Sequence, residues 1–350
     1  MNQIQSEPNS TEYSALKSVS AEIGVDPMLI QAAGGNTSIK DGNVMWIKAS
    51  GTLLADALEK DIFVPVDLAE MRKAVAAGEA RADQPGEFLI PGFSTLRPSI
   101  ETSLHAVFEQ NVVIHAHSVN TLAHAIRSDA ETLLETRLNG LKWASVPYAK
   151  PGANLARAVT DMLGNGTDVI ILRNHGVIVA ADTVGAAHVL LRDVHDRLAL
   201  DEDQKLTPNL ELLQSLADGG SYQLPDYEPL HQLALKSARC SQASAGSLYP
   251  DHVIFCGIGV AVMEEGETPQ QVSERLEAMG MPAPVFMLIP GTGVLARSDA
   301  SSGAVALMRC LADVLMRVPT DVQLDYLSHE QNLELLNWDA EKYRQALNAS

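Results

Sequence analysis

About a third of the way along the sequence, a short apolar run ends in a pair of histidines: Val112-Val113-Ile114-His115-Ala116-His117. The apolar residues predict a buried strand. Residues two apart on a strand point to the same face, so we expect both imidazoles to converge at one edge of a sheet. Neighbouring neutral imidazoles suit a divalent transition metal. A His-x-His pair alone is equally compatible with one exposed and one packed histidine.

The segments around this strand alternate between strand and helix patterns. The turn Asp41-Gly42-Asn43 separates two short runs and predicts a β-hairpin. Apolar runs predict further strands over 169–172 and 177–180, and helical spacing predicts helices over 12–23, 98–108, 154–163 and 183–200. Because a hairpin interrupts the alternation, we expect an α/β fold with a mixed or antiparallel central sheet flanked by helices.

The length of 350 residues suggests about two domains. Charged and turn residues become frequent between 201 and 227, so we predict a catalytic domain over 1–215 and a smaller C-terminal α/β extension over 225–350. In the extension the patterns predict strands at 253–255, 259–263 and 285–289, and helices at 269–279 and 302–317.

Composition excludes several classes of function. The net charge of −19 repels phosphate backbones and anionic lipid, which disfavours a nucleic-acid or membrane partner. An anionic substrate therefore needs a local pocket that overcomes the repulsion by the negative charge of the whole protein. The three cysteines lack metal-ligand spacing and favour a reducing compartment. With neither a signal peptide nor an apolar stretch of ~18–20 residues, we expect a cytoplasmic protein.

Two further residues extend the histidine pair into a candidate metal site. His175 follows a predicted apolar strand and precedes Gly176, which allows a close approach. Glu101 lies in the first turn of a predicted helix. Three histidines with an open fourth position are typical of a catalytic zinc site. A helix-borne pair of Glu101 and His105 is the alternative; it ranks lower because His105 would lie a full turn deeper, in the core.

Three glycine-rich stretches have both a functional and a purely structural interpretation. The stretches 34–38 and 48–51 lie on either side of the hairpin and can form a phosphate-binding nest, or simply turns. Residues 291–296 match the G-x-G-x-x-A form of a dinucleotide-binding loop. Pro290 interrupts the preceding strand, and the next helix begins only near 302, so an oxidoreductase is the weakest hypothesis.

Together these motifs resemble the class II aldolase/adducin family over residues 14–200. The resemblance rests on six motifs in order: Gly34-Gly35-Asn36-Thr37-Ser38, Lys48-Ala49-Ser50-Gly51, Arg97-Pro98-Ser99-Ile100-Glu101 with His105, His115-Ala116-His117, Val146-Pro147-Tyr148 and Asn174-His175-Gly176. The C-terminal part is similar to the aldolase half of bifunctional rhamnulose-phosphate aldolase/alcohol dehydrogenases.

The resemblance implies roles for particular residues. It implies a divalent metal, Zn²⁺ with Mn²⁺ or Co²⁺ as alternatives, bound by His115, His117 and His175. It implies Glu101 as general acid/base. It also implies a substrate-phosphate pocket formed by Asn36, Ser50, Gly51 and Ser99. Finally, it implies a homo-oligomer, a tetramer with the active site at the subunit interface.

Two departures from the family pattern bear on the reaction. Ile100 stands where short aldolases of the family carry a second serine, and residues 118–146 contain no tyrosine to act as proton donor. The family's epimerases carry aspartate at the position of Glu101, so the glutamate favours a lyase.

The resulting hypothesis is a metal-dependent carbon–carbon lyase. Its substrate would be a small sugar or sugar acid, specifically a ketose phosphate, cleaved through a metal-stabilised enediolate. The alternatives are a decarboxylase of a 3-oxo sugar-acid phosphate, a sugar-phosphate dehydratase or epimerase, and a non-catalytic adducin-like scaffold.

Overall fold

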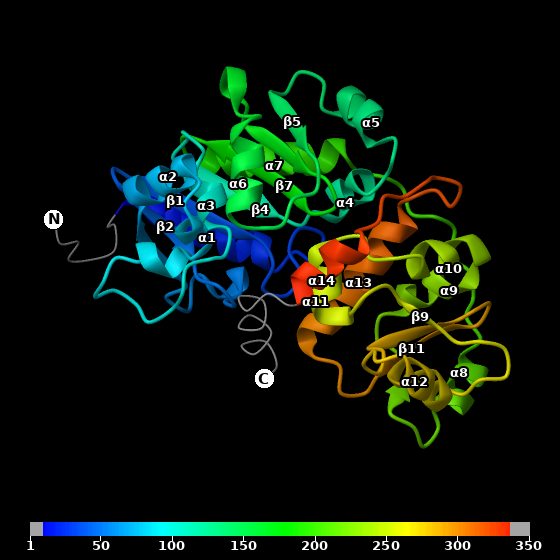
Figure 1. Cartoon of the computed structure of the whole chain (residues 1–350). Coiled ribbons are helices and arrows are strands. Elements are labelled where there is room, and N and C mark those ends of the chain that lie inside the picture. Colours follow the sequence, from blue (N-terminus) through cyan, green and yellow to red (C-terminus); the bar gives the residue numbers. More distant parts are fainter. Residues whose placement is uncertain (1–9, 337–350) are drawn as a thin grey trace. The chain divides into compact units, whose positions relative to one another are not determined.

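The computed structural model describes residues 10–336, which form two compact units (Figure 1). The first unit contains residues 10–121 and 134–198. The second contains residues 122–133 and 199–336. The segment 122–133 therefore groups with residues that follow it by more than sixty positions in the chain.

The first unit is built on a sheet that has seven strands within the described residues, in the order β3-β2-β1-β4-β7-β6-β5. The strands are β1 (Asn36–Asp41), β2 (Val44–Lys48), β3 (Phe63–Asp67), β4 (Val112–Ala116), β5 (Trp143–Val146), β6 (Val169–Leu172) and β7 (Gly176–Ala181). Only β5 and β6 are parallel neighbours among these strands. The predicted mixed sheet is thus confirmed, as is the hairpin at Asp41-Gly42-Asn43.

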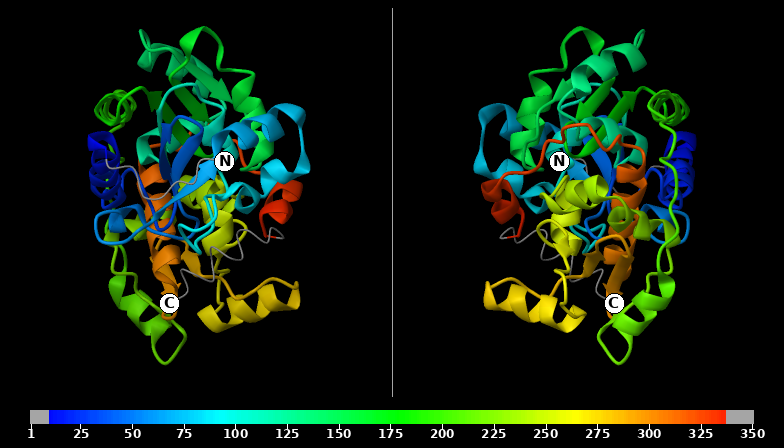
Figure 2. Two further views of the ribbon diagram at one scale, coloured as in Figure 1. Left: turned by 90° about the vertical axis from the view of Figure 1, so that its left-hand side faces the viewer. Right: turned by 90° about the vertical axis from the view of Figure 1, so that its right-hand side faces the viewer.

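Helices cover both faces of this sheet. One face carries α1 (Thr11–Gly24) and α7 (Val184–Arg197), drawn dark blue and green side by side in Figure 2. The other face carries α2 (Leu68–Ala77), α3 (Thr102–Ala106) and α6 (Ala153–Thr160). The chain passes between the two units within α4 (Val119–Ala125) and α5 (Ala130–Arg137).

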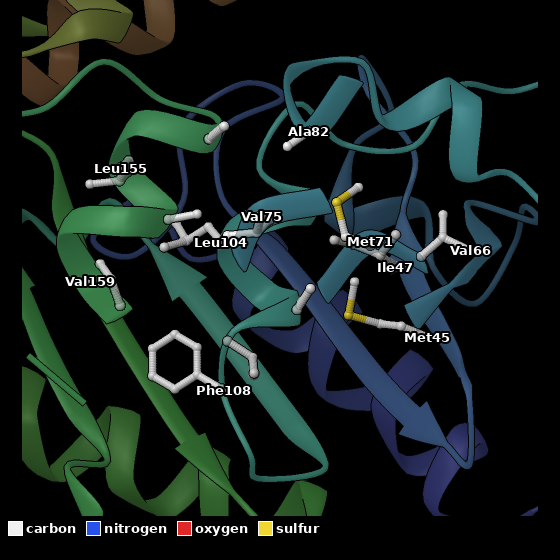
Figure 3. Close-up of a cluster of buried hydrophobic side chains, with 14 of the residues drawn as sticks. Met45, Ile47, Val66, Met71, Val75, Ala82, Leu104, Phe108, Leu155 and Val159 are labelled. Atoms are coloured by element: carbon white, nitrogen blue, oxygen red, sulfur yellow. The ribbon is translucent and has the colours of Figure 1, made fainter. Parts of the chain in front are cut away.

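A buried apolar cluster fixes α3 against the second of these faces (Figure 3). Met45 and Ile47 alternate along β2 and so point to the same side. Leu104 and Phe108, from α3 and the loop after it, lie in the same cluster and are fully buried. Burial of such side chains contributes ~1.5–3 kcal/mol each, so this packing holds α3 close to the sheet.

The predicted helix over 98–108 is confirmed only in part, because α3 begins at Thr102. Residues 97–99 instead pair with residues 48–50: Ser50 N–H donates to the Arg97 carbonyl (2.8 Å), and Ser99 N–H donates to the Lys48 carbonyl (3.1 Å). The extended backbone of this pairing is incompatible with a helix before Ser99.

The second unit has a sheet of four strands among the described residues, in the order β8-β11-β10-β9. Its strands are β8 (Tyr222–Gln223), β9 (Ala261–Val262), β10 (Phe286–Ile289) and β11 (Gly293–Arg297). Its helices are α8 (Leu210–Ala217), α9 (Gln232–Leu235), α10 (Ser237–Ser244), α11 (Pro250–Cys256), α12 (Pro269–Ala278), α13 (Ser302–Met316) and α14 (His329–Leu336).

Two sequence predictions in this unit have clear outcomes. The predicted strand at 253–255 is wrong, because these residues lie in α11 and pack against α13. A short apolar run does not distinguish a strand from a buried helix, and Pro250 suits a first helical turn. The stretch 291–296 forms the turn between β10 and β11 and then β11 itself, so it is not a loop that opens a helix.

Two further observations concern the cysteines and the helices. Cys240, Cys256 and Cys310 are all buried free thiols. Across residues 10–336, no helix combines the length and the apolar character needed to cross a membrane.

Candidate metal centre and acid–base site

Three histidines of the first unit converge on one point. His115 lies on β4, His117 follows that strand directly, and His175 lies in the turn between β6 and β7. Their ligand nitrogens lie within 4.8 Å of one another, and all three residues are buried. The ring centroids are 4.9 Å apart for His115 and each of the other two, and 5.2 Å apart for His117 and His175. The imidazoles of the His-x-His pair therefore converge, as the strand geometry predicts.

The turn that brings His175 to this point depends on its neighbours. Asn174 has a φ of 55°, a left-handed conformation that asparagine tolerates better than most residues. Gly176 lies where a Cβ atom would come within 2.4 Å of the Ala116 carbonyl oxygen. Only glycine permits this approach of β7 to the end of β4, just before His117.

Hydrogen bonding sets the tautomer of His115. Its Nδ1 lies 3.0 Å from the Val177 carbonyl oxygen. A carbonyl only accepts, so Nδ1 carries the proton and Nε2 presents a lone pair. That Nε2 lies 3.1 Å from Nε2 of His117. Two buried imidazole nitrogens at this distance, with a third close by, fit a divalent cation that all three would bind.

Glu101 lies over the histidines at the N-terminus of α3. Its Oε2 is 3.5 Å from His115 Nε2, and its Oε1 is 3.5 Å from His175 Nε2. Asn36 donates through Nδ2 to Oε2 at 2.8 Å. Oε1 accepts no hydrogen bond within the described part of the chain. One carboxylate oxygen is thus held by Asn36, and the other accepts no such bond from the described residues.

The electrostatics of the site favour the carboxylate form of Glu101. Burial raises the pKa of its carboxyl group, but positive charge on His115, His175 and His117 when these rings are protonated, together with the Asn36 hydrogen bond, outweighs burial and lowers the pKa to about 2. With the rings neutral, a cation held by them would supply positive charge at the same place. Glu101 is therefore ionised at neutral pH and can act as a proton acceptor.

The segments of the predicted phosphate pocket lie side by side. The pairing of 48–50 with 97–99 places Ser50 and Ser99 on adjoining extended segments, and Ser99 Oγ accepts from Glu101 N–H at 3.2 Å. The backbone N–H groups of Ser50 and Ser99 are already used in this pairing. The donors left for an anion are therefore the side chains of Ser50, Ser99 and Asn36 and the backbone N–H of Gly51.

Two nearby lysines have structural partners. Lys40 Nζ donates to the carbonyls of Phe108 (2.6 Å) and Gln110 (2.7 Å), at the far end of β1 from the histidines. Lys40 is therefore engaged away from the residues of the predicted phosphate pocket. Lys48 Nζ donates to the carbonyls of Ala33 and Gly35 and so stabilises the glycine loop before Asn36.

His105 does not join Glu101 as a metal pair. It lies one turn further along α3, fully buried, with its Nδ1 2.8 Å from Ser38 Oγ. Burial lowers the pKa of His105 to about 3, so the ring is neutral. In the described residues, the group able to hold a metal consists of His115, His117 and His175.

The contact between Asn36 and Glu101 was not predicted from the sequence, where the resemblance implies Asn36 as part of the phosphate pocket alone. A signal exists in the sequence: Asn36, Ser38 and Lys40 alternate along β1 as a buried polar stripe. Polar residues with strand periodicity that face a core require partners, and this pattern points to polar groups on the opposite helix.

The model of the class II aldolase and adducin N-terminal domain matches residues 19–199 of this chain. The match spans more than half of the 350 residues, and the chain belongs to the class II aldolase and adducin family. Class II aldolases use a divalent metal ion, and the buried histidines are a group able to hold one.

Similar proteins include enzymes and an uncharacterised protein. An L-fuculose phosphate aldolase of Methanocaldococcus jannaschii is 28 % identical over 189 residues, which cover 52 % of this chain and 88 % of that protein. The uncharacterized oxidoreductase YuxG of Bacillus subtilis is 27 % identical over 179 residues, covering 46 % of this chain but only 25 % of YuxG. The N-terminal class II aldolase domain of a conserved protein from Thermoplasma acidophilum is 26 % identical with a TM-score of 0.49, covering 57 % of this chain and 97 % of that one.

Proposed function

We propose that this protein is a metal-dependent carbon–carbon lyase that cleaves a small ketose phosphate. Zn²⁺ is the proposed metal, with His115, His117 and His175 as its ligands and Glu101 as the acid/base. The observation that carries the proposal is the carboxylate of Glu101 lying 3.5 Å from two of the three clustered imidazoles. The similarity to L-fuculose phosphate aldolases supports the choice of substrate class.

The metal, when bound, would supply Lewis-acid stabilisation of negative charge on substrate oxygens. Glu101 contributes proton transfer. Because Oε2 is held by Asn36, Oε1 is the oxygen that takes a proton from a substrate hydroxyl or returns one to carbon. The buried surroundings exclude water and strengthen these electrostatic interactions.

The decisive experiment combines metal analysis with a substrate screen. We expect about one divalent ion per chain, and release of an aldehyde from a ketose phosphate. His117→Ala should abolish both metal binding and cleavage while leaving the circular-dichroism spectrum unchanged. Full metal occupancy in His117→Ala would contradict the ligand assignment.

The same screen separates the remaining reactions of the family. Carbon dioxide from a 3-oxo sugar-acid phosphate would identify a decarboxylase, and loss of water or inversion at one carbon would identify a dehydratase or epimerase. A protein that binds metal yet converts none of these compounds would be an adducin-like scaffold. Each of these results would replace the lyase proposal.

We further propose that Ser50, Gly51, Ser99 and Asn36 bind the substrate phosphate. Ser50→Ala removes a side-chain donor without touching Glu101, so KM should rise for the phosphorylated substrate and stay constant for its unphosphorylated counterpart. An equal rise for both compounds would show that Ser50 serves folding instead.

The proposed assembly is a cytoplasmic homotetramer with the active site at the subunit interface. Light scattering of the full chain tests the assembly. A fully active monomer would refute it.

A further inference from the structure

The strand β1 and the segment that begins at Glu101 are joined by a series of buried polar contacts. Asn36 donates to Glu101 Oε2 (2.8 Å), and Ser38 Oγ lies 2.8 Å from His105 Nδ1. Lys40 Nζ donates to the carbonyls of Phe108 and Gln110. We call these three contacts the polar ladder.

The ladder follows from two matching periodicities. A step of two residues along a strand is ~6.6 Å, and a step of four residues along a helix is ~6 Å. Asn36, Ser38 and Lys40 are two residues apart, while Glu101 and His105 are four apart, so the contacts align along the two elements. Asn36 pairs directly with His115 across β1 and β4, which puts the first contact of the ladder beside the histidine cluster.

The middle contact is the most deeply buried and lies away from the proposed substrate groups. Ser38 and His105 are both 0 % exposed, and neither is within the histidine cluster. His105 N–H also donates to the Glu101 carbonyl at 3.2 Å, so the backbone of Glu101 is fixed through His105. Moving His105 would therefore shift Glu101 itself.

We propose that Ser38 and His105 are positioning residues that set the Glu101 carboxylate over the metal site. This inference rests on the proposed role of Glu101. The buried apolar cluster of Figure 3 packs α3 against the sheet but does not fix the register between them, whereas the hydrogen-bonded contacts allow a single register.

Four variants of the full chain test the proposal. His105→Leu removes the contact to Ser38, and His105→Asn is smaller than histidine but retains a polar atom near the position of Nδ1. Ser38→Ala removes the partner with a smaller change in volume. Ser20→Ala is the matched control, because Ser20 Oγ makes an equally buried 2.7 Å hydrogen bond to Thr37 on the opposite face of β1.

We expect His105→Leu to retain full metal stoichiometry and a KM within threefold of wild type, while kcat falls by at least tenfold. Ser38→Ala should also lower kcat, and the double variant should be no worse than His105→Leu, because the two residues act as a pair. His105→Asn should retain most of the kcat that His105→Leu loses. Ser20→Ala should lower the melting temperature by about as much as Ser38→Ala does, but it should leave kcat unchanged. If kcat falls equally in Ser20→Ala, or falls only together with metal content, the positioning role is refuted.

A structural measurement separates this inference from the proposed function. Crystal structures of metal-loaded variants should show the contact between Asn36 and Glu101 lost in His105→Leu and kept in His105→Asn and Ser20→Ala. An intact contact in His105→Leu would overturn the inference whatever the activity. If the contact is lost as expected but the wild type cleaves no ketose phosphate, the proposed function fails and the positioning role stands.

Discussion

Glu101 has two carboxylate oxygens in different surroundings, and this difference bears on its proposed role as the acid/base. Asn36 holds Oε2, and the imidazoles of His115 and His175 lie 3.5 Å from the two oxygens. Glu101→Gln keeps the shape of the side chain and removes its ability to accept a proton. We expect kcat to fall by at least ~10²-fold, as for loss of a positioned proton carrier, with metal content near wild type. Turnover within a few-fold of wild type in Glu101→Gln would assign the proton transfer to another residue.

Lys40 gives a residue-scale prediction about stability. Burial, followed by the charge of Arg72, lowers the pKa of Lys40 from 10.5 to about 7, and Glu109 offsets this only in part. Between pH 7 and the unfolded pKa, the unfolded chain therefore binds about one more proton than the native protein. The free energy of unfolding should rise with pH in this window, by up to ~1.4 kcal/mol per pH unit.

The Lys40→Met variant isolates this effect. Urea denaturation at pH 7 and pH 9 should show the wild type gaining stability relative to Lys40→Met as the pH increases. Lys60→Met is the control, because Lys60 is exposed and its pKa is raised by Asp56, so it does not titrate in this window. Parallel pH curves for the wild type and Lys40→Met would contradict a lowered pKa.

At the scale of the elements, the sequence predicts structure formed by neighbouring residues. It does not predict contacts between segments that lie far apart in the chain. The hairpin of β1 and β2 was predictable because an Asp-Gly turn joins neighbouring runs. The pairing of 48–50 with 97–99 joins segments almost fifty residues apart, and it shortened the helix that the sequence alone predicted. The contact between Asn36 and Glu101 spans 65 residues and was missed for the same reason. The convergence of His115 and His117 was predictable, because it depends only on the alternation of side chains along a single strand.

The approach of β7 to β4 gives a prediction at this scale. A Cβ atom at position 176 would lie 2.4 Å from the Ala116 carbonyl oxygen, which is backbone and cannot move away cheaply. Gly176→Ala should lower the free energy of unfolding by ~2–3 kcal/mol and should weaken metal binding, because the end of β4 positions His117. Gly185→Ala is the control: a Cβ there meets nothing within 4 Å, and alanine should leave stability unchanged or raise it by ~0.5 kcal/mol in the helix. Equal melting temperatures and metal affinities for the two variants would show that β4 and β7 tolerate separation.

At the scale of the whole molecule, some features have no local signal in the sequence. Residues 122–133 belong to the second unit, although neither composition nor a linker marks them. Their place depends on contacts with distant backbone: Ser128 N–H donates to the Gln323 carbonyl, and Asp325 N–H donates to the Ile126 carbonyl. Such pairings arise only in the folded chain. The net charge, in contrast, is readable from the sequence directly and acts over the entire molecule.

The charge of −19 leads to a prediction about ionic strength. The proposed substrate carries a phosphate, so long-range repulsion should slow its association, and the donors of Ser50 and Ser99 act only at contact. The Debye length falls from ~30 Å at 0.01 M salt to ~8 Å at 0.15 M, so salt removes the repulsion before it weakens the contacts. We therefore expect kcat/KM for the phosphorylated substrate to rise severalfold over this range, and kcat/KM for an uncharged analogue to stay constant. A fall in kcat/KM with added salt would mean that a locally positive field at the site outweighs the charge of the molecule.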